Sequence, residues 1–138
     1  MVASKRKDSF PGRQSARESF ATRPAFSGWD SDAIAGYVEC GLIGEGPVEL
    51  ACDPQVEAEI YRGSRDHATW VRLGEIETPA LVLCGEDSDT VTPDLARAQA
   101  MQLSRAGVDV VPGTGHFLPM ERPDLVAERV RRVVEAFS

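Results

Sequence analysis

Gly113-Thr-Gly-His116-Phe-Leu-Pro-Met-Glu121-Arg-Pro123 is the stretch that decides the fold of this chain. It lies between a short apolar run, Val108–Val111, and an amphipathic segment that begins at Pro123. The apolar run predicts a β-strand, and the amphipathic segment predicts a helix. Open α/β sheets carry their chemistry at the carboxyl ends of the strands. The glycine turn therefore predicts that His116 is exposed at the end of a strand and takes part in catalysis.

A second apolar run, Ala80–Cys84, lies upstream and is continuous, which is typical of a strand covered on both faces in a parallel sheet. A polar loop follows it, and Pro93 begins a helix that leads to the run Val108–Val111. The order strand, helix, strand predicts a βαβ unit with a right-handed crossover. The helix from Pro123 is expected to cover one face of this sheet with an apolar stripe of Leu125, Val126, Val130, Val133, Val134 and Phe137.

Upstream of these strands the pattern is helical. Asp30 or Ser31 can cap a helix that stops at Gly41. Asp53 followed by Pro54 predicts a further helix start. This helix is expected to end at Gly63 with Val56, Ile60 and Tyr61 facing inward, and weaker helical patterns cover Gln14–Arg23 and His67–Leu73.

The segment Pro79-Ala-Leu-Val-Leu-Cys-Gly-Glu-Asp-Ser-Asp-Thr-Val-Thr-Pro93, followed by the Gly-His-Phe block, resembles the last third of an α/β-hydrolase. Trp29–Val38 and Val48–Ala58 are similar to the helical cap that these enzymes insert before the penultimate strand. The resemblance implies a partial α/β-hydrolase fold of class α/β. A helical cap region at 1–74 would precede a core at 75–138 that holds the last two parallel strands and their flanking helices.

The nucleophile of this fold stands on a strand-to-helix elbow written Gly-x-Ser-x-Gly, and no two glycines of this chain are four residues apart. The family's order is nucleophile, acid, histidine. The resemblance therefore implies the C-terminal half of a hydrolase, as a truncated form or a fragment.

An imidazole that acts as a base needs a carboxylate to hold its tautomer and to stabilise the imidazolium ion. In the family the acid most often stands three residues after the strand's glycine, but Ser88 occupies that place here. Counted back from Pro93, Asp89 stands at the family's usual interval, so the loop carries one extra residue. The resemblance implies that His116 and Asp89 are catalytic, with Asp87 as the alternative acid.

The implied activity is hydrolysis of a carboxylic ester or related acyl bond by a Ser-His-Asp mechanism, when the missing N-terminal half is present. The chain alone is expected to be inactive because it lacks the nucleophile. Two alternatives remain open: a catalytically inactive binding or regulatory module derived from the same fold, and another chemistry such as epoxide or haloalkane hydrolysis or acyl transfer. The expected partners are a small-molecule substrate and either a complementary hydrolase half or a second copy of the chain.

Phe26, Trp29 and Tyr37 are candidates to line an apolar substrate slot beneath the cap. The same rings could instead hold the cap helices together, because aromatic side chains dominate packing generally. His67 lies in a polar helical stretch without a glycine turn and is not expected to be catalytic. Glu121 is expected to cap or pair near the last helix.

The formal net charge of -7 argues against a nucleic-acid or anionic-membrane partner. The charged start at Lys5–Lys7 argues against a signal peptide, and no apolar run is long enough to cross a bilayer. Cys40, Cys52 and Cys84 have neither a tight disulfide spacing nor the short spacings of a zinc site. We expect buried or half-buried free thiols, no metal or other cofactor, and a cytoplasmic location.

Overall fold

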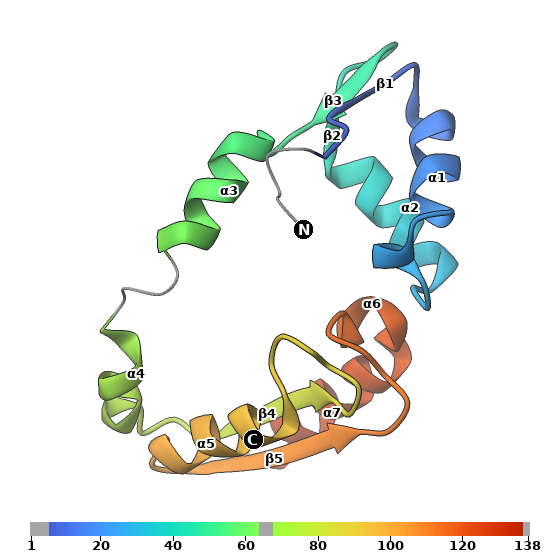
Figure 1. Ribbon diagram of the computed structural model, residues 1–138. Coiled ribbons are helices and arrows are strands. Elements are labelled where there is room, and N and C mark those ends of the chain that lie inside the picture. Colours follow the sequence, from blue (N-terminus) through green and yellow to red (C-terminus); the bar gives the residue numbers. More distant parts are fainter. Residues whose placement is uncertain (1–5, 64–67, 137–138) are drawn as a thin grey trace. The chain divides into compact units, whose positions relative to one another are not determined.

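The computed structural model of the chain describes residues 6–63 and 68–136 (Figure 1). The chain divides into two compact units, residues 1–67 and residues 68–138. The boundary expected near Gly74 lies within the second unit, in the 3-10 helix η3 (Leu73–Glu75). No described helix is both long enough and apolar enough to cross a bilayer.

The first unit contains a small antiparallel sheet of three strands in the order β1-β3-β2. The sequence predicted a helical cap here and did not predict this sheet, because strands of two or three residues show no recognisable alternation. Among the described residues of this unit, three α-helices and one 3-10 helix accompany the sheet. The elements are β1 (Ser9–Phe10), α1 (Arg13–Ala21), η2 (Pro24–Phe26), α2 (Ser31–Cys40), β2 (Leu42–Ile43), β3 (Val48–Leu50) and α3 (Pro54–Gly63).

Helix α2 forms as its sequence predicts. The carboxylate of Asp30 accepts a hydrogen bond of 2.8 Å from the backbone N–H of Asp32, which satisfies one of the unpaired donors of the first turn. Ile34 and Val38, four residues apart, are buried on one face. Gly41 follows the last turn, and its N–H donates to the carbonyl of Tyr37. The predicted start and end of this helix are confirmed.

The core of the first unit lies where α1 and α2 pack beside the small sheet. The Phe20 ring on α1 is fully buried, and its centroid lies 5.2 Å from that of Phe10 and 5.3 Å from that of Tyr37. Aromatic pairs at this separation stabilise by about 0.5–1.5 kcal/mol beyond the burial of their surface. The buried members of the core are Phe10, Ala16, Phe20, Ile34, Val38, Leu42, Val48 and Leu50.

Helix α3 has the predicted bounds but not the predicted face. Val56, Ile60 and Tyr61 are exposed, whereas Pro54 and Ala58 are buried. The apolar spacing was correctly taken as helical, but within this unit the helix is held along a different face. The prediction that Val56, Ile60 and Tyr61 face inward is therefore wrong for the described unit.

Arg6 is the residue that ties α3 to α2. Its guanidinium donates from Nη1 to Oε2 of Glu57 on α3 at 2.6 Å, and from Nη2 to the hydroxyl of Tyr37 on α2 at 2.7 Å. The side chains of Arg6 and Glu57 are only 22% and 23% exposed, so water screens the ion pair less than it would on an open surface.

The second unit is built on two strands, β4 and β5, that pair in parallel from Ala80 opposite Ala106 to Gly85 opposite Val111. This confirms the predicted adjacent parallel strands. Helix α5 connects them and packs against both (Figure 1). The elements are α4 (Thr69–Arg72), η3, β4 (Ala80–Gly85), α5 (Pro93–Gln102), β5 (Ala106–Val111), α6 (Leu118–Glu121) and α7 (Pro123–Ala136).

Helix α7 is joined to β5 by an ion pair between Arg129 Nε and Asp109 Oδ2 at 2.5 Å. Its apolar stripe is only partly covered, because Val130 is 56% exposed and Val134 is 59% exposed. Leu125, Val126 and Val133 are half-buried, and the predicted member Phe137 lies outside the described residues. The helix forms as predicted, but the expectation that this stripe covers the sheet is wrong for Val130 and Val134 within this unit.

The three cysteines are free, as predicted. Cys84 at the end of β4 is buried, but Cys40 and Cys52 are exposed, so the expectation of buried or half-buried thiols is wrong for those two. Burial raises the pKa of the Cys84 thiol, which favours the neutral form. Because the thiolate is the reactive form, Cys84 is poorly suited to act as a nucleophile.

Candidate functional site

The candidate site lies in the two loops that follow β4 and β5, at the carboxyl ends of the paired strands. Backbone hydrogen bonds join the loops: Glu86 N–H donates to the carbonyl of Val111, and Asp87 N–H donates to that of Thr114, each at 2.9 Å. The loops approach so closely at Gly85 that an added Cβ would lie 2.2 Å from the carbonyl oxygen of Gly115. Only glycine allows this contact between the two backbones.

The loop after β5 is held by its own turn chemistry. Gly113 has a φ of +63°, which favours glycine. The buried Thr114 hydroxyl donates to the carbonyl of Val111 at 2.8 Å. The N–H of Gly115 donates to Oε2 of Glu121 at 2.7 Å. Three fixed residues thus precede His116, whose side chain is exposed as the glycine turn predicts.

Ser88 makes the polar contact with the His116 imidazole, and the Phe117 ring also lies beside it, with the ring centroids 5.2 Å apart. Its Oγ lies 3.5 Å from Nδ1 of the ring. The Ser88 side chain is buried, with 6% of the residue exposed, although Asp87 and Asp89 on either side are exposed. The Ser88 Oγ also accepts a hydrogen bond of 3.2 Å from the backbone N–H of Val91. The structure therefore places a neutral hydroxyl, anchored to the loop, at Nδ1.

Asp89, the candidate acid, has a different contact. Its Oδ1 accepts a hydrogen bond of 3.1 Å from the hydroxyl of Thr90. Among the described residues, no hydrogen bond or ion pair joins His116 to Asp89 or to the alternative acid Asp87. The catalytic roles of His116 and Asp89 stay predictions.

The predicted substrate-binding residues lie together in the first unit. The ring centroid of Phe26 lies 4.7 Å from that of Trp29 and 5.5 Å from that of Tyr37, and those of Trp29 and Tyr37 are 5.8 Å apart. All three side chains are half-buried and pack against the core of that unit. These contacts account for a packing role, and substrate binding by the three rings stays a prediction.

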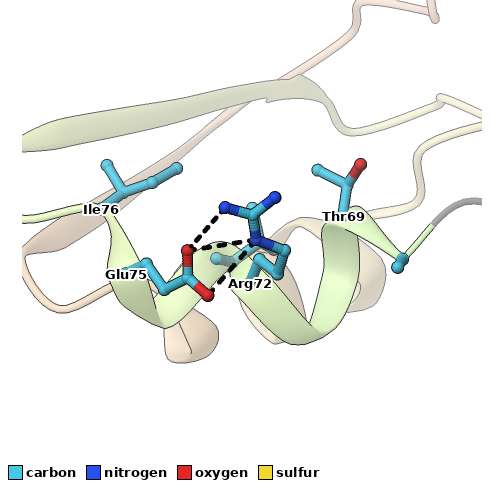
Figure 2. Close-up of a pocket in the computed structure, with 6 residues that line it drawn as sticks. Thr69, Arg72, Glu75 and Ile76 are labelled. Carbon is cyan, nitrogen blue, oxygen red and sulfur yellow. Dashed lines mark hydrogen bonds and ion pairs between the residues drawn. The ribbon is translucent and has the colours of Figure 1, made fainter.

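A shallow pocket of about 510 Å³ lies on the segment of α4 and η3 (Figure 2). Its lining includes Arg72 and Glu75, whose guanidinium and carboxylate form hydrogen bonds of 3.0 to 3.3 Å with each other, as the dashed lines show. His116 and Ser88 are not among the lining residues, which are Ala68, Thr69, Arg72, Leu73, Glu75 and Ile76. The pocket is thus separate from the candidate site.

No cluster of three or more His, Cys, Asp or Glu side chains suited to a metal ion occurs within residues 6–63 and 68–136. His67, which was not expected to be catalytic, lies outside those ranges.

Two residues of the site have contacts that the sequence analysis did not predict. Ser88 contacts the imidazole, and its place three residues after Gly85 is the one signal that could have identified it. Glu121 was expected to cap or pair near the last helix, but it reaches back to the loop of His116. Nothing in the spacing of Glu121 indicates this contact, because it depends on how the short helix α6 turns.

The comparisons with known proteins agree with this architecture. A family model described as the alpha/beta hydrolase family matches residues 4–129. The abhydrolase domain-containing protein AFT2-1 of Alternaria alternata is 28% identical across 93% of this chain, and the match spans 64% of that relative's length.

Among solved structures, the peroxisomal alpha-beta-hydrolase Lpx1 of Saccharomyces cerevisiae superposes with a TM-score of 0.82 at 20% identity, over 99% of this chain and 38% of that one. The E-2-(acetamidomethylene)succinate hydrolase superposes with a TM-score of 0.76 at 20% identity, over 91% of this chain and 46% of that one. These likenesses support the fold, and the family match covers most of the chain. The chain belongs to the alpha/beta hydrolase family.

Proposed function

We propose that this chain supplies the histidine and the acid of a hydrolase that cleaves a carboxylic ester or a related acyl bond. The nucleophilic serine would come from an N-terminal half that this sequence does not contain. The observation that carries the proposal is the exposed His116 on a fixed glycine loop, at the carboxyl ends of two paired parallel strands.

In this proposal His116 takes the proton of the serine hydroxyl at Nε2 and returns it to the leaving group. Asp89 is the proposed acid, which would stabilise the imidazolium ion. General-base assistance contributes roughly two to four powers of ten in rate. Donors of an oxyanion hole contribute on the order of 3 kcal/mol each, and in this family one of them follows the nucleophile directly. We therefore expect the chain alone to be a very poor catalyst.

A partner is supported by the uncovered apolar side chains of the second unit. Val71 is 79% exposed, Met101 is 84% exposed and Val130 is 56% exposed. The described sheet of this unit has two parallel strands, whereas parallel sheets are usually larger and covered on both faces. We propose that a complementary hydrolase half, or a second copy of the chain, covers these side chains. The free cysteines support the proposal of a reducing compartment, the cytoplasm.

The proposal is tested by extending the chain with the segment encoded upstream of it and measuring hydrolysis of p-nitrophenyl esters. Turnover that falls at least a hundredfold in the His116→Ala variant is expected. The Asp89→Asn variant should lose activity more strongly than Asp87→Asn. Turnover that does not depend on His116 would rule the proposal out, and the reverse order of the two Asp variants would move the acid to Asp87.

One observation favours a second candidate function. The contact at Nδ1 of His116 is a neutral serine hydroxyl, whereas an active base of this kind is usually held by a carboxylate. The chain would then be a binding or regulatory module without catalysis. A small apolar ligand that binds the chain and its His116→Ala variant equally well, together with no esterase activity in the extended protein, would support this function instead.

A further inference from the structure

We propose that Ser88 is the positioning residue for His116: its hydroxyl holds the imidazole at Nδ1 and leaves Nε2 directed toward the exposed side of the loop. The catalytic consequence of this inference rests on the proposed function, whereas the orientation of His116 by Ser88 rests on the contact between the two side chains. The Ser88 Oγ and the His116 Nδ1 are 3.5 Å apart and belong to the two loops that backbone hydrogen bonds join.

The burial of Ser88 is the first argument. Within the acidic loop, Glu86, Asp87 and Asp89 are exposed, while Ser88 is buried and turned toward the loop of His116. A buried hydroxyl without a hydrogen-bond partner lowers stability by about 1–3 kcal/mol, so the Ser88 hydroxyl has to point toward groups that can form hydrogen bonds with it.

Its anchoring is the second argument. The Ser88 N–H donates to the carbonyl of Gly85 at 3.3 Å, and the Ser88 Oγ accepts from the N–H of Val91 at 3.2 Å. Gly85 is the last residue of β4 and Val91 lies in the loop that follows, so the hydroxyl is fixed relative to the end of β4. A fixed hydroxyl can orient an imidazole, because the ring has only two torsions to lose.

The chemistry of a hydroxyl gives this contact a specific meaning. A serine hydroxyl has one hydrogen and two lone pairs. The backbone N–H of Val91 donates to one lone pair of the Ser88 Oγ. The other lone pair can accept from Nδ1–H of His116, or the hydroxyl hydrogen can be donated to an unprotonated Nδ1. When Nδ1–H donates, Nε2 keeps its lone pair and can accept a proton. After Nε2 has been protonated, the same Nδ1–H still donates to Ser88.

Ser88 and the acid therefore have different roles. A carboxylate both orients the ring and neutralises the imidazolium charge, whereas Ser88 carries no charge and can only orient the ring. Charge stabilisation is left to a carboxylate of the loop, for which Asp89 is the proposed residue. Loss of Ser88 should thus affect mainly the orientation and the tautomer of the ring, and loss of Asp89 mainly the stability of the imidazolium ion.

The test uses the full chain labelled with ¹⁵N, and long-range ¹H–¹⁵N correlation spectra that show the two ring nitrogens of His116. A His67→Gln variant assigns the second histidine of the chain. In the Ser88→Ala variant we expect both ring nitrogens of His116 to move toward the shifts of a freely exchanging imidazole. Ser88→Thr, which keeps the hydroxyl, should preserve the original shifts. Ser104→Ala is the matched control: it removes a serine hydroxyl that donates to the carbonyl of Gly74, and it should leave the ring nitrogens unchanged.

The proposal is overturned if Ser88→Ala leaves the ring nitrogens in place, or if Ser104→Ala moves them as far. Ser88→Ala also removes the acceptor of the Val91 N–H, so the amide signal of Val91 reports whether the loop persists. If the loop is lost, the Ser88→Cys variant is used in place of Ser88→Ala, because a thiol keeps the shape of the serine side chain and is only a weak donor and acceptor. The same displacement of the ring nitrogens is then expected.

The catalytic part is read in the extended protein. Ser88→Ala should lower kcat roughly tenfold with an unchanged KM, and Ser88→Thr should restore it. The two proposals fail separately. Ring shifts that respond as expected without any ester turnover would retain Ser88 as a positioning residue and remove the hydrolase function. Turnover that requires His116 but is unaffected by Ser88→Ala would retain the hydrolase function and remove the positioning role of Ser88.

Discussion

The carboxylate of Glu121 accepts a hydrogen bond of 2.7 Å from the backbone N–H of Gly115, the residue before His116. A side chain of the short helix α6 therefore holds the peptide that carries the candidate base. The contact also explains the small residue at this position, since a Cβ on Gly115 would lie 2.9 Å from Oε1 of the same Glu121 side chain.

Replacement of Glu121 should loosen the loop of His116. Glu121→Ala removes a half-buried, charge-assisted acceptor, which corresponds to roughly 1.5–3 kcal/mol of unfolding free energy. Glu121→Gln keeps an acceptor oxygen and should lose less. Urea unfolding gives the free energies, and hydrogen exchange at the Gly115 amide gives the local effect. Equal protection of this amide in Glu121→Ala and in the unsubstituted chain would contradict the prediction.

Gly85→Ala should destabilise the second unit strongly. The added Cβ would lie 2.2 Å from the carbonyl oxygen of Gly115 and 2.3 Å from that of Thr114, and neither backbone atom can move without separating the loops. We expect a loss of about 3 kcal/mol or more in unfolding free energy, at the upper end of overpacking effects.

Gly107→Ala is the matched control for this substitution. It lies on β5, and its added Cβ would meet only the Leu81 side chain at 3.5 Å, an ordinary contact. Its unfolding free energy should change by less than about 1 kcal/mol. Similar losses in both variants would mean that the close approach at Gly85 does not determine stability.

Arg6→Ala should release α3 from the rest of the first unit, because the guanidinium bonds both Glu57 and Tyr37. Hydrogen exchange along α3 is expected to rise, while α2 keeps its protection. A double-mutant cycle with Glu57→Ala should give a coupling of about 1 kcal/mol for this partly buried pair. Tyr37→Phe removes only the second acceptor, so a loss as large as that of Arg6→Ala would contradict the central role of Arg6.

The ion pair between Arg122 and Asp124 at the start of α7 should contribute to acid sensitivity. The Arg122 guanidinium and the backbone N–H of Leu125 lower the pKa of Asp124 from 3.8 to about 2. A lowered pKa in the folded state gives a contribution that is present above pH 3.8 and lost as the pH falls toward 2. Asp124→Asn and Arg122→Gln should both reduce the loss of stability in this window, measured by urea unfolding at several pH values. An unchanged profile in both variants would contradict the assignment.

The strand pairing was predictable because its signals are local and strong. The continuous apolar run ending at Cys84 and the run ending at Val111 were expected to be adjacent parallel strands, and they are. Helix α2 was predictable for the same reason, since an Asp cap and a Gly stop bracket its apolar face. The face of α3 was not, and one of its contacts, the ion pair of Glu57 with Arg6, joins residues far apart in the sequence.

The site was predictable down to the loop but not down to the atom. The glycine turn predicted an exposed His116, and His116 is exposed in the structure. Which residue of the preceding loop meets the ring depends on the turn that Ser88 makes with Gly85 and Val91. The spacing from Gly85 selects Ser88 and the spacing from Pro93 selects Asp89, so the sequence alone does not decide between the two residues.

The backbone hydrogen bonds between the loops after β4 and β5 also bear on protein engineering. The contacts that hold Ser88 and His116, and the paired strands that carry the two loops, come from residues within the range 80–121. The arrangement of this half-site is therefore encoded in one short continuous stretch. Such a stretch is a natural donor for split reporters and for grafting onto foreign nucleophile-bearing halves.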